Sequence, residues 1–312
     1  MIESVPRPDV RRDDLAEWCA VNLGAEAVEE MFATGHLSQV VGLRLGDGRQ
    51  VVVKVRPPAP RLAGCVEVQH VLGTRGFPCP RLLAGPTPLG AHTATAEALL
   101  PGGAILAASP ATTRLSARAL RHLIVLAPGA ETVPTLEPTP PWAGWDHTEG
   151  GVWPIPDDRA ADLNAHPGPA WLDTVGERVR TRLTSSPLPH VVAHVDWEMQ
   201  NLRWRGEHLH AAHDWDSVAV RPEAGIVGLA AAVHTVTGEP SREASDDQVE
   251  DFLLAYKDAR RRAFTREERE VAWAAGLWVR AFNAKKDSLD GDGPTLARLA
   301  AEAPRRLERA SA

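Results

Sequence analysis

Two carboxylates and one amide side chain occur near the middle of the chain in an order suited to phosphoryl transfer. Asp196 and Asn201 lie five residues apart, and Asp214 follows in the segment His-Asp-Trp-Asp. Transfer of a γ-phosphoryl group needs a carboxylate beside the accepting hydroxyl and oxygen ligands that hold Mg²⁺ against the phosphates. His194, Asp196 and Asn201 have the spacing of a kinase catalytic loop, although Val195 stands where protein kinases have Arg. The pattern predicts a phosphoryl-transfer site and leads away from protein kinases.

The segment between Asn201 and Asp214 predicts a short β-hairpin. Residues 202–204 and 208–213 have the character of strands, and the polar turn 205–207 separates them. A hairpin of this kind brings its two flanking residues together. We therefore expect Asn201 and Asp214 to lie at the same end of it.

The first hundred residues contain a candidate phosphate-binding lysine. Residues 40–45 and 50–55 are strand-forming runs separated by Gly-Asp-Gly-Arg, which predicts a hairpin with Lys54 on its second strand. Its three preceding valines make Lys54 similar to the strand lysine that contacts the α- and β-phosphates in kinases. The turn at 34–39 is then expected to cover the nucleotide, with Ser38 and backbone amides near the phosphates. This turn lacks a full Gly-x-Gly-x-x-Gly pattern.

A lysine in this role needs a carboxylate that holds it in place. Glu67 is the sole acidic residue between Val55 and Ala96. It lies in a predicted helix at 61–72, which Pro60 precedes and Gly73 follows. A strand lysine or a helix glutamate taken alone is usually a solvated surface residue. We predict a Lys54–Glu67 ion pair because both residues precede the catalytic segment in the required order.

With these motifs the chain resembles the aminoglycoside phosphotransferase and choline kinase-like group of small-molecule kinases. The resemblance covers most of the chain and includes an apolar segment ending in Pro101-Gly102. It implies an α+β, bilobal protein kinase-like fold, with a strand-rich lobe at 1–98 and a mostly helical lobe at 99–312. The family often has an Asp before a Leu-Ala pair after the metal segment, where this chain has Gly228.

The resemblance also implies a role for each site residue and a pair of cofactors. Asp196 and His194 are expected to be the catalytic residues, with Asp196 orienting or deprotonating a hydroxyl of a small molecule. Asn201 and Asp214 are expected to hold Mg²⁺. The backbone around Ala98 and Leu99 is expected to take the base of ATP or GTP.

Composition agrees with an enzyme of two lobes and a small-molecule substrate. The chain has 312 residues and a net charge of −7, which argues against a broad nucleic-acid surface and favours a cationic substrate. No apolar run approaches the roughly 20 residues of a membrane span, and the first residues do not resemble a signal sequence, so a cytoplasmic location is expected. The three cysteines predict neither disulfides nor a zinc ribbon.

A Pro- and Gly-rich insertion at about 127–169 interrupts the second half of the chain. Long irregular segments in compact proteins are often functional. Trp142, Trp145 and Trp153 lie in it and could stack on a ring substrate, although a core position is the more common one for Trp. Acidic residues cluster at 146–162, 239–251 and 287–292, where solvated surface is the more common reading and a substrate cup the alternative.

Two other functions compete with small-molecule phosphotransfer. Five histidines near Asp196 and Asp214 could serve a metal-dependent hydrolase, although that reading leaves Lys54 and Glu67 unexplained. A non-catalytic kinase-like binding protein is the second alternative, supported by Gly228 and the incomplete glycine turn. A protein acceptor is disfavoured because the next predicted helix begins soon after Asp216, which leaves no room for an activation segment.

Overall fold

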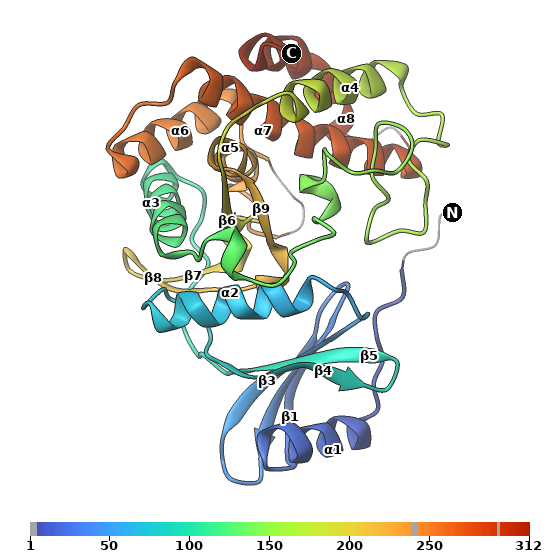
Figure 1. The fold of residues 1–312 in the computed structure, drawn as a ribbon, viewed down its shortest axis with the longest axis vertical. Coiled ribbons are helices and arrows are strands. Elements are labelled where there is room, and N and C mark those ends of the chain that lie inside the picture. The colour runs from blue at the N-terminus through green and yellow to red at the C-terminus, as the bar shows by residue number, and fades with distance from the viewer. Residues whose placement is uncertain (1–4, 239–242, 292–293) are drawn as a thin grey trace.

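A five-stranded antiparallel sheet follows the first helix of the chain. The computed structural model describes residues 5–238, 243–291 and 294–312. Helix α1 (Arg12–Leu23) comes first, and the strands are β1 (Ala27–Thr34), β2 (Gln39–Leu45), β3 (Gln50–Arg56), β4 (Leu82–Leu89) and β5 (His92–Ala98). Their order in the sheet is β1-β2-β3-β5-β4. Helix α2 (Leu62–Thr74) joins β3 to β4, and Figure 1 shows α1 and α2 on opposite sides of the sheet.

The alternation of side chains along β3 aims Lys54 away from α1. Val51, Val53 and Val55 are fully buried in a core that includes side chains of α1. Successive side chains of a strand point to opposite faces, so Lys54 faces the rest of the molecule. The predicted hairpin at 40–55 is confirmed, with the register Val40↔Lys54.

The second half of the described chain is mostly helical. Its strands form two small antiparallel pairs. Helices α4, α5 and α8 pack around α7, and α6 packs between α3 and α5 (Figure 1). The helices are α3 (Pro110–Leu126), α4 (Ala170–Thr184), α5 (Glu223–Val233), α6 (Asp246–Arg260), α7 (Arg266–Asp287) and α8 (Pro294–Ala310). The paired strands are β6 (His190–His194) with β9 (Val218–Pro222), and β7 (Leu202–Arg205) with β8 (His208–Ala212). Among the described residues, no helix is long and apolar enough to cross a membrane.

Helix α2 packs mainly against the helical part of the molecule. Its buried side chains Cys65, Val68 and Leu72 belong to the larger hydrophobic core, separate from the core under the sheet. Phe77, just after α2, meets the ring of Trp215 edge-on, with centroids 6.0 Å apart. The sheet and the helical part therefore have separate cores, and α2 lies between them.

The insertion at 127–169 is irregular, as predicted, with two short 3-10 turns at Ala130–Thr132 and Pro141–Ala143. Arg180 of α4 fastens it by donating hydrogen bonds to the carbonyls of Trp145, His147 and Gly151 at 2.7–2.8 Å. Trp145 and Trp153 are only 3% and 1% exposed, which confirms the core position for these two rings. Of the other acidic clusters, residues 239–242 and 292 lie outside the described residues.

Candidate functional site

The loop after β6 presents Asp196, and Asn201 holds its carboxylate. Val195 donates its backbone amide to the carbonyl of Ser217 at 2.8 Å, which anchors the start of the loop. The Asn201 Nδ2 group donates to Oδ2 of Asp196 at 2.8 Å and to its backbone carbonyl at 3.0 Å. Burial raises the pKa of Asp196 to about 6, although the bond from Asn201 acts in the opposite direction. Asp196 is thus an oriented carboxylate with raised proton affinity.

His194 is a structural residue, which corrects the prediction that it takes part directly in catalysis. Its ring is 1% exposed and lies 5.8 Å, centroid to centroid, from both Trp197 and Trp215. Nδ1 accepts the backbone N–H of Asp196 at 3.2 Å, so Nε2 carries the proton and donates to the His213 carbonyl at 3.0 Å. Burial lowers its pKa to about 4. His194 therefore joins the Asp196 loop to the Asp214 segment through backbone groups.

The predicted hairpin brings Asn201 and Asp214 together. Strands β7 and β8 pair with the register Leu202↔Ala212, and the amide of His213 donates to the carbonyl of Asn201 at 2.9 Å. Asp214 itself has a left-handed backbone, with φ of 66°. This conformation is uncommon for residues other than glycine, but Asp tolerates it better than most.

Asp214 shares its surroundings with a second carboxylate, Asp216. The negative charge of Asp216, together with burial, raises the pKa of Asp214 well above its usual value. Burial acts to raise the pKa of Asp216, but the charges of Arg56 and Lys54 and a hydrogen bond from Asp214 together outweigh it, so the pKa lies below its usual value. Arg56 Nη1 is 3.0 Å from Asp216 Oδ2. This ion pair connects β3 to the Asp214 segment across the two parts of the molecule.

The carboxylate partner of Lys54 is Glu97, so the predicted pair with Glu67 is wrong. Lys54 Nζ lies 3.3 Å from Glu97 Oε1, and both side chains are largely buried. Gln69 of α2 donates to the other Glu97 oxygen at 3.1 Å. Strand register explains the pair: Lys54 faces Thr95, and Glu97 is its diagonal neighbour on the same face.

Helix geometry explains why Glu67 does not take this role. Residues two positions apart on a helix point about 200° away from each other. Gln69 faces Glu97, so Glu67 is directed elsewhere, and it makes no ion pair within the described part of the chain. Glu97 lies just beyond the interval 55–96 in which Glu67 is the sole acidic residue.

Two backbone amides of the segment expected to bind the nucleotide base already donate hydrogen bonds to other backbone carbonyls. Ala98 donates to the carbonyl of Arg81 at 2.8 Å, and Leu99 to that of Gln50 at 3.0 Å. Their N–H groups therefore belong to the sheet, and a base can use only other backbone groups there. In the turn between β1 and β2, Gly35 has φ of 114°, and a Cβ there would lie 2.0 Å from the Ser38 carbonyl oxygen. Ser38 is the last residue of this turn, after His36 and Leu37.

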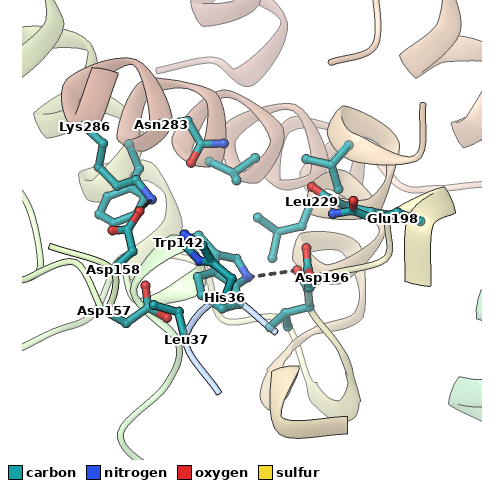
Figure 2. Close-up of a pocket in the computed structure, with 15 residues that line it drawn as sticks. His36, Leu37, Trp142, Asp157, Asp158, Asp196, Glu198, Leu229, Asn283 and Lys286 are labelled. Carbon is teal, nitrogen blue, oxygen red and sulfur yellow. Dashed lines mark hydrogen bonds and ion pairs between the residues drawn. The ribbon is translucent and has the colours of Figure 1, made fainter. Parts of the chain in front are cut away.

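A cavity of about 290 Å³ opens beside Asp196 (Figure 2). His36 and Leu37 of the β1–β2 turn, Leu229 of α5 and Phe282 of α7 contribute to its wall. Trp142 lies beside Asp196 and donates its indole N–H to the Val195 carbonyl at 3.3 Å. Four carboxylates and one lysine also line the cavity: Asp157, Asp158, Asp196, Glu198 and Lys286.

Several of these cavity residues were not predicted individually from the sequence. Asp157 and Asp158 belong to the acidic cluster at 146–162, for which the substrate-cup reading was the less common one. Lys286 pairs with Asp158 at 2.7 Å, which neutralises one of the acids. Burial raises the pKa of Glu198 well above its usual value. A helical repeat places Asn283 and Lys286 on one face of α7, but that pattern does not indicate what the face meets.

The histidines near Asp196 do not form a metal centre. Within the described residues, no group of three His, Cys, Asp or Glu side chains is arranged to hold a metal ion by itself. His194 contacts backbone groups, and the ring of His210 contacts the Pro101 carbonyl at 3.0 Å. This arrangement does not support the metal-dependent hydrolase.

Comparisons with known proteins agree on the fold. No family model and no curated protein sequence matches this chain. A solved choline/ethanolamine kinase family protein from Mesorhizobium loti is similar over 95% of this chain and 93% of its own, at 16% identity and a TM-score of 0.57. An amicoumacin kinase, solved with AMP-PNP and Ca²⁺, is similar over 95% of this chain and 94% of its own, at 10% identity and a TM-score of 0.65.

A spectinomycin phosphotransferase solved with ADP and spectinomycin is also similar, covering 96% of this chain and 94% of its own, at 12% identity and a TM-score of 0.58. Structures of aminoglycoside phosphotransferases are among the similar ones as well. The chain therefore has the α+β, protein kinase-like fold of small-molecule kinases, and the predicted fold class is confirmed.

Proposed function

We propose that this protein transfers the γ-phosphoryl group of ATP or GTP to a hydroxyl group of a small molecule. The observation that carries the proposal is the arrangement around Asp196. Its carboxylate is held by Asn201, opens on a cavity, and lies on the same side of the sheet as the Lys54–Glu97 pair. The fold shared with small-molecule kinases over most of the chain supports the same reaction.

The donor set fits a magnesium ion. Mg²⁺ is usually held by one or two carboxylates together with substrate phosphates, so it does not need three acidic residues. Asp214 and Asp216 repel each other, and Asp216 Oδ1 is buried without a hydrogen-bond partner in the described chain. Asn201 donates through its Nδ2 group, which leaves its Oδ1 atom for a metal. Asp214 and Asn201 would hold the ion, which neutralises charge on the phosphates.

The other roles in phosphoryl transfer fall to side chains around Asp196 and on β3. Lys54, held by Glu97, binds the α- and β-phosphates, as its strand position suggests. Asp196 accepts the proton of the attacking hydroxyl or orients it, and Asn201 keeps the carboxylate in place. Leu37 and Trp142 narrow the space beside Asp196 and limit the access of water.

The acceptor that fits best is a hydroxylated amine. Acidic side chains outnumber basic ones around the cavity, and the pairing of Lys286 with Asp158 leaves Asp157 and Asp196 to face a ligand. Trp142 and Phe282 add aromatic surface on which a ring or an ammonium group can pack. The similar solved enzymes carry names of antibiotic and amino-alcohol kinases, in agreement with such an acceptor.

The binding-only alternative loses its main support. Gly228 replaces a family Asp, but it lies in the contact of α5 with α7, where a Cβ would be 1.9 Å from the carbonyl oxygen of Ala272. An Asp side chain has no room in this packing. Helix packing thus supplies a structural reason for glycine at this position.

Purified protein tests the proposal in an assay of Mg²⁺-dependent ATP and GTP consumption with aminoglycosides, other hydroxylated antibiotics, amino alcohols and sugars. We expect turnover with one acceptor class, a loss of at least about a hundredfold in Asp196→Ala with nucleotide binding retained, and weaker Mg²⁺-nucleotide binding in Asp214→Ala. Asp162→Ala, an exposed acid outside the cavity, serves as control. Undiminished turnover by Asp196→Ala would remove this residue from the mechanism.

A further inference from the structure

A second and larger cavity lies next to the one beside Asp196. It has a volume of about 510 Å³ and is formed almost entirely by the insertion at 127–169. Asp157 lines both cavities. The 3-10 turn at Pro141–Ala143 separates them, since Pro141 lines the larger cavity and its neighbour Trp142 the smaller one. Figure 2 shows Asp157 and Trp142 near each other at the edge of the smaller cavity.

The walls of the larger cavity are mostly apolar. They contain four prolines, namely Pro138, Pro140, Pro141 and Pro154. Ile155 also lines the cavity and remains 56% exposed, so its side chain is accessible to a ligand there. Concave, predominantly apolar sites with a few placed polar groups are typical of small-molecule binding.

Most charged groups of this cavity are already paired. Glu149 Oε2 lies 2.8 Å from Nδ1 of His147, and Asp146 pairs with Arg221. Glu137 accepts the backbone amide of Thr139 at 2.7 Å, and Arg61 donates to the Val218 carbonyl. Asp157 is different, because its carboxylate forms no hydrogen bond or ion pair with another side chain of the described residues; its own backbone amide and the nearby charge of Lys286 act on it. The unpaired carboxylate thus stands where the two cavities meet.

We infer that the two cavities form one extended binding site for an amine- and hydroxyl-bearing compound that carries an apolar ring system. The hydroxylated part lies beside Asp196, the ammonium group meets Asp157, and the apolar rings fill the proline-walled cavity. This inference rests on the proposed function for the role of Asp196, and it narrows the acceptor class. Choline or ethanolamine would fill only the smaller cavity, of about 290 Å³.

Dansylcadaverine is a suitable probe because it joins a primary amine to an apolar fluorescent ring system. Its binding to the full chain is followed by fluorescence anisotropy without nucleotide. We expect saturable binding that weakens by at least about tenfold in Asp157→Asn, the size of one lost charge-assisted hydrogen bond. Thr148→Trp, which places a bulky ring in the larger cavity from an exposed position, should weaken binding similarly. Dansylamide, which lacks the amine, should bind less tightly than dansylcadaverine.

Thr174→Trp provides the matched control, since Thr174 is an exposed residue of α4 outside both cavities. Its affinity for the probe should equal that of the unmodified protein. The inference is overturned if dansylcadaverine does not bind saturably, or if Thr148→Trp binds it as well as Thr174→Trp does. Turnover of ethanolamine without probe binding would overturn this inference alone, whereas probe binding without any nucleotide turnover would count against the proposed function alone.

Discussion

Single residues in this protein acquire their roles from a partner on another element. Lys54 is held by Glu97 of the neighbouring strand, and Gln69 of α2 supports that glutamate from the other side. His194 uses both ring nitrogens on backbone groups. These contacts separate the residues that face the cavity from those that support them.

Glu97→Gln is expected to weaken nucleotide use. Removing the charge leaves the largely buried Lys54 without its ion pair, and misplacement of a phosphate-binding group can reduce kcat/KM by up to about a hundredfold. Steady-state kinetics with varied ATP and direct measurement of Mg²⁺-ATP affinity check the effect. Glu67→Gln is the matched control and should leave both quantities unchanged. Equal losses of nucleotide use in the two variants would indicate that Glu67 of α2 also positions Lys54.

A buried histidine that does not itself line the cavity is expected to make stability depend on pH. His234 contacts Thr113 Oγ1 and the Ala231 carbonyl, both at 3.0 Å, and burial lowers its pKa from 6.5 to about 4. The unfolded chain therefore takes up a proton near pH 6.5, whereas the folded chain does so only near pH 4. The stabilisation from neutral His234 is present above pH 6.5 and is lost as pH falls through 4, on the order of 3 kcal/mol.

Denaturant unfolding between pH 7 and pH 4 measures this dependence. His234→Gln should be less stable at pH 7, because it loses ring packing against Phe252, yet its stability should decline less steeply on acidification. If the decline is as steep in His234→Gln, other groups cause the acid sensitivity.

At the scale of elements, the close approach of α5 and α7 shapes the smaller cavity. Gly228 and Gly276 face each other's helices, and the Gly228 carbonyl oxygen lies 3.0 Å from the position of a Cβ on Gly276. Leu229 of α5 and Phe282 of α7 reach the cavity from this pair. The small residues thus allow two adjacent helices to line one wall.

Gly228→Ala is expected to destabilise the fold by about 1–3 kcal/mol or more, because the added methyl group meets backbone atoms of Ala272. Gly225→Ala on the same helix is the control, since its Cβ would find Trp145 at 3.4 Å, an ordinary contact. Thermal and denaturant unfolding compare the two. Equal stability of the two alanine variants would show that the helices can separate at little cost.

At the scale of the whole molecule, two hydrophobic cores of different extent meet at α2. The sheet and α1 enclose the smaller one, and the helical part, together with α2, encloses the larger one. Arg56 pairs with Asp216 across this boundary, and Arg61, next to α2, donates to the Val218 carbonyl. The two parts of the molecule are therefore connected largely by polar contacts and by α2.

Hydrogen exchange should show two levels of stability. Amides of β2 and β3 are expected to open at lower free energy than those of α5 and α7, because the sheet buries less apolar surface. Native-state exchange measured by NMR or mass spectrometry checks this order. Arg56→Gln should lower protection in the sheet more than in α7. Uniform protection across both parts would contradict the two-core description.

Much of the architecture could be predicted from local sequence patterns. The hairpins at 40–55 and 202–213 and the helix near 61–72 are expected close to their observed bounds, and a helix does begin soon after Asp216. Periodicity, turn residues and proline or glycine boundaries act over a few positions, so a sequence displays them directly. The spacing of Asp196 and Asn201, and their approach to Asp214, followed from the same short-range information.

The sequence by itself therefore determined the order of Lys54, Asp196, Asn201 and Asp214 and the elements that carry them. Tertiary structure alone decided that Glu97 pairs with Lys54 and that Asp157 lines both cavities. It also decided that the His194 ring binds backbone groups of Asp196 and His213. The physical reason is that these contacts depend on strand register, on helix rotation and on the path of an irregular insertion. Each of these properties is set by packing between residues that are distant in the chain.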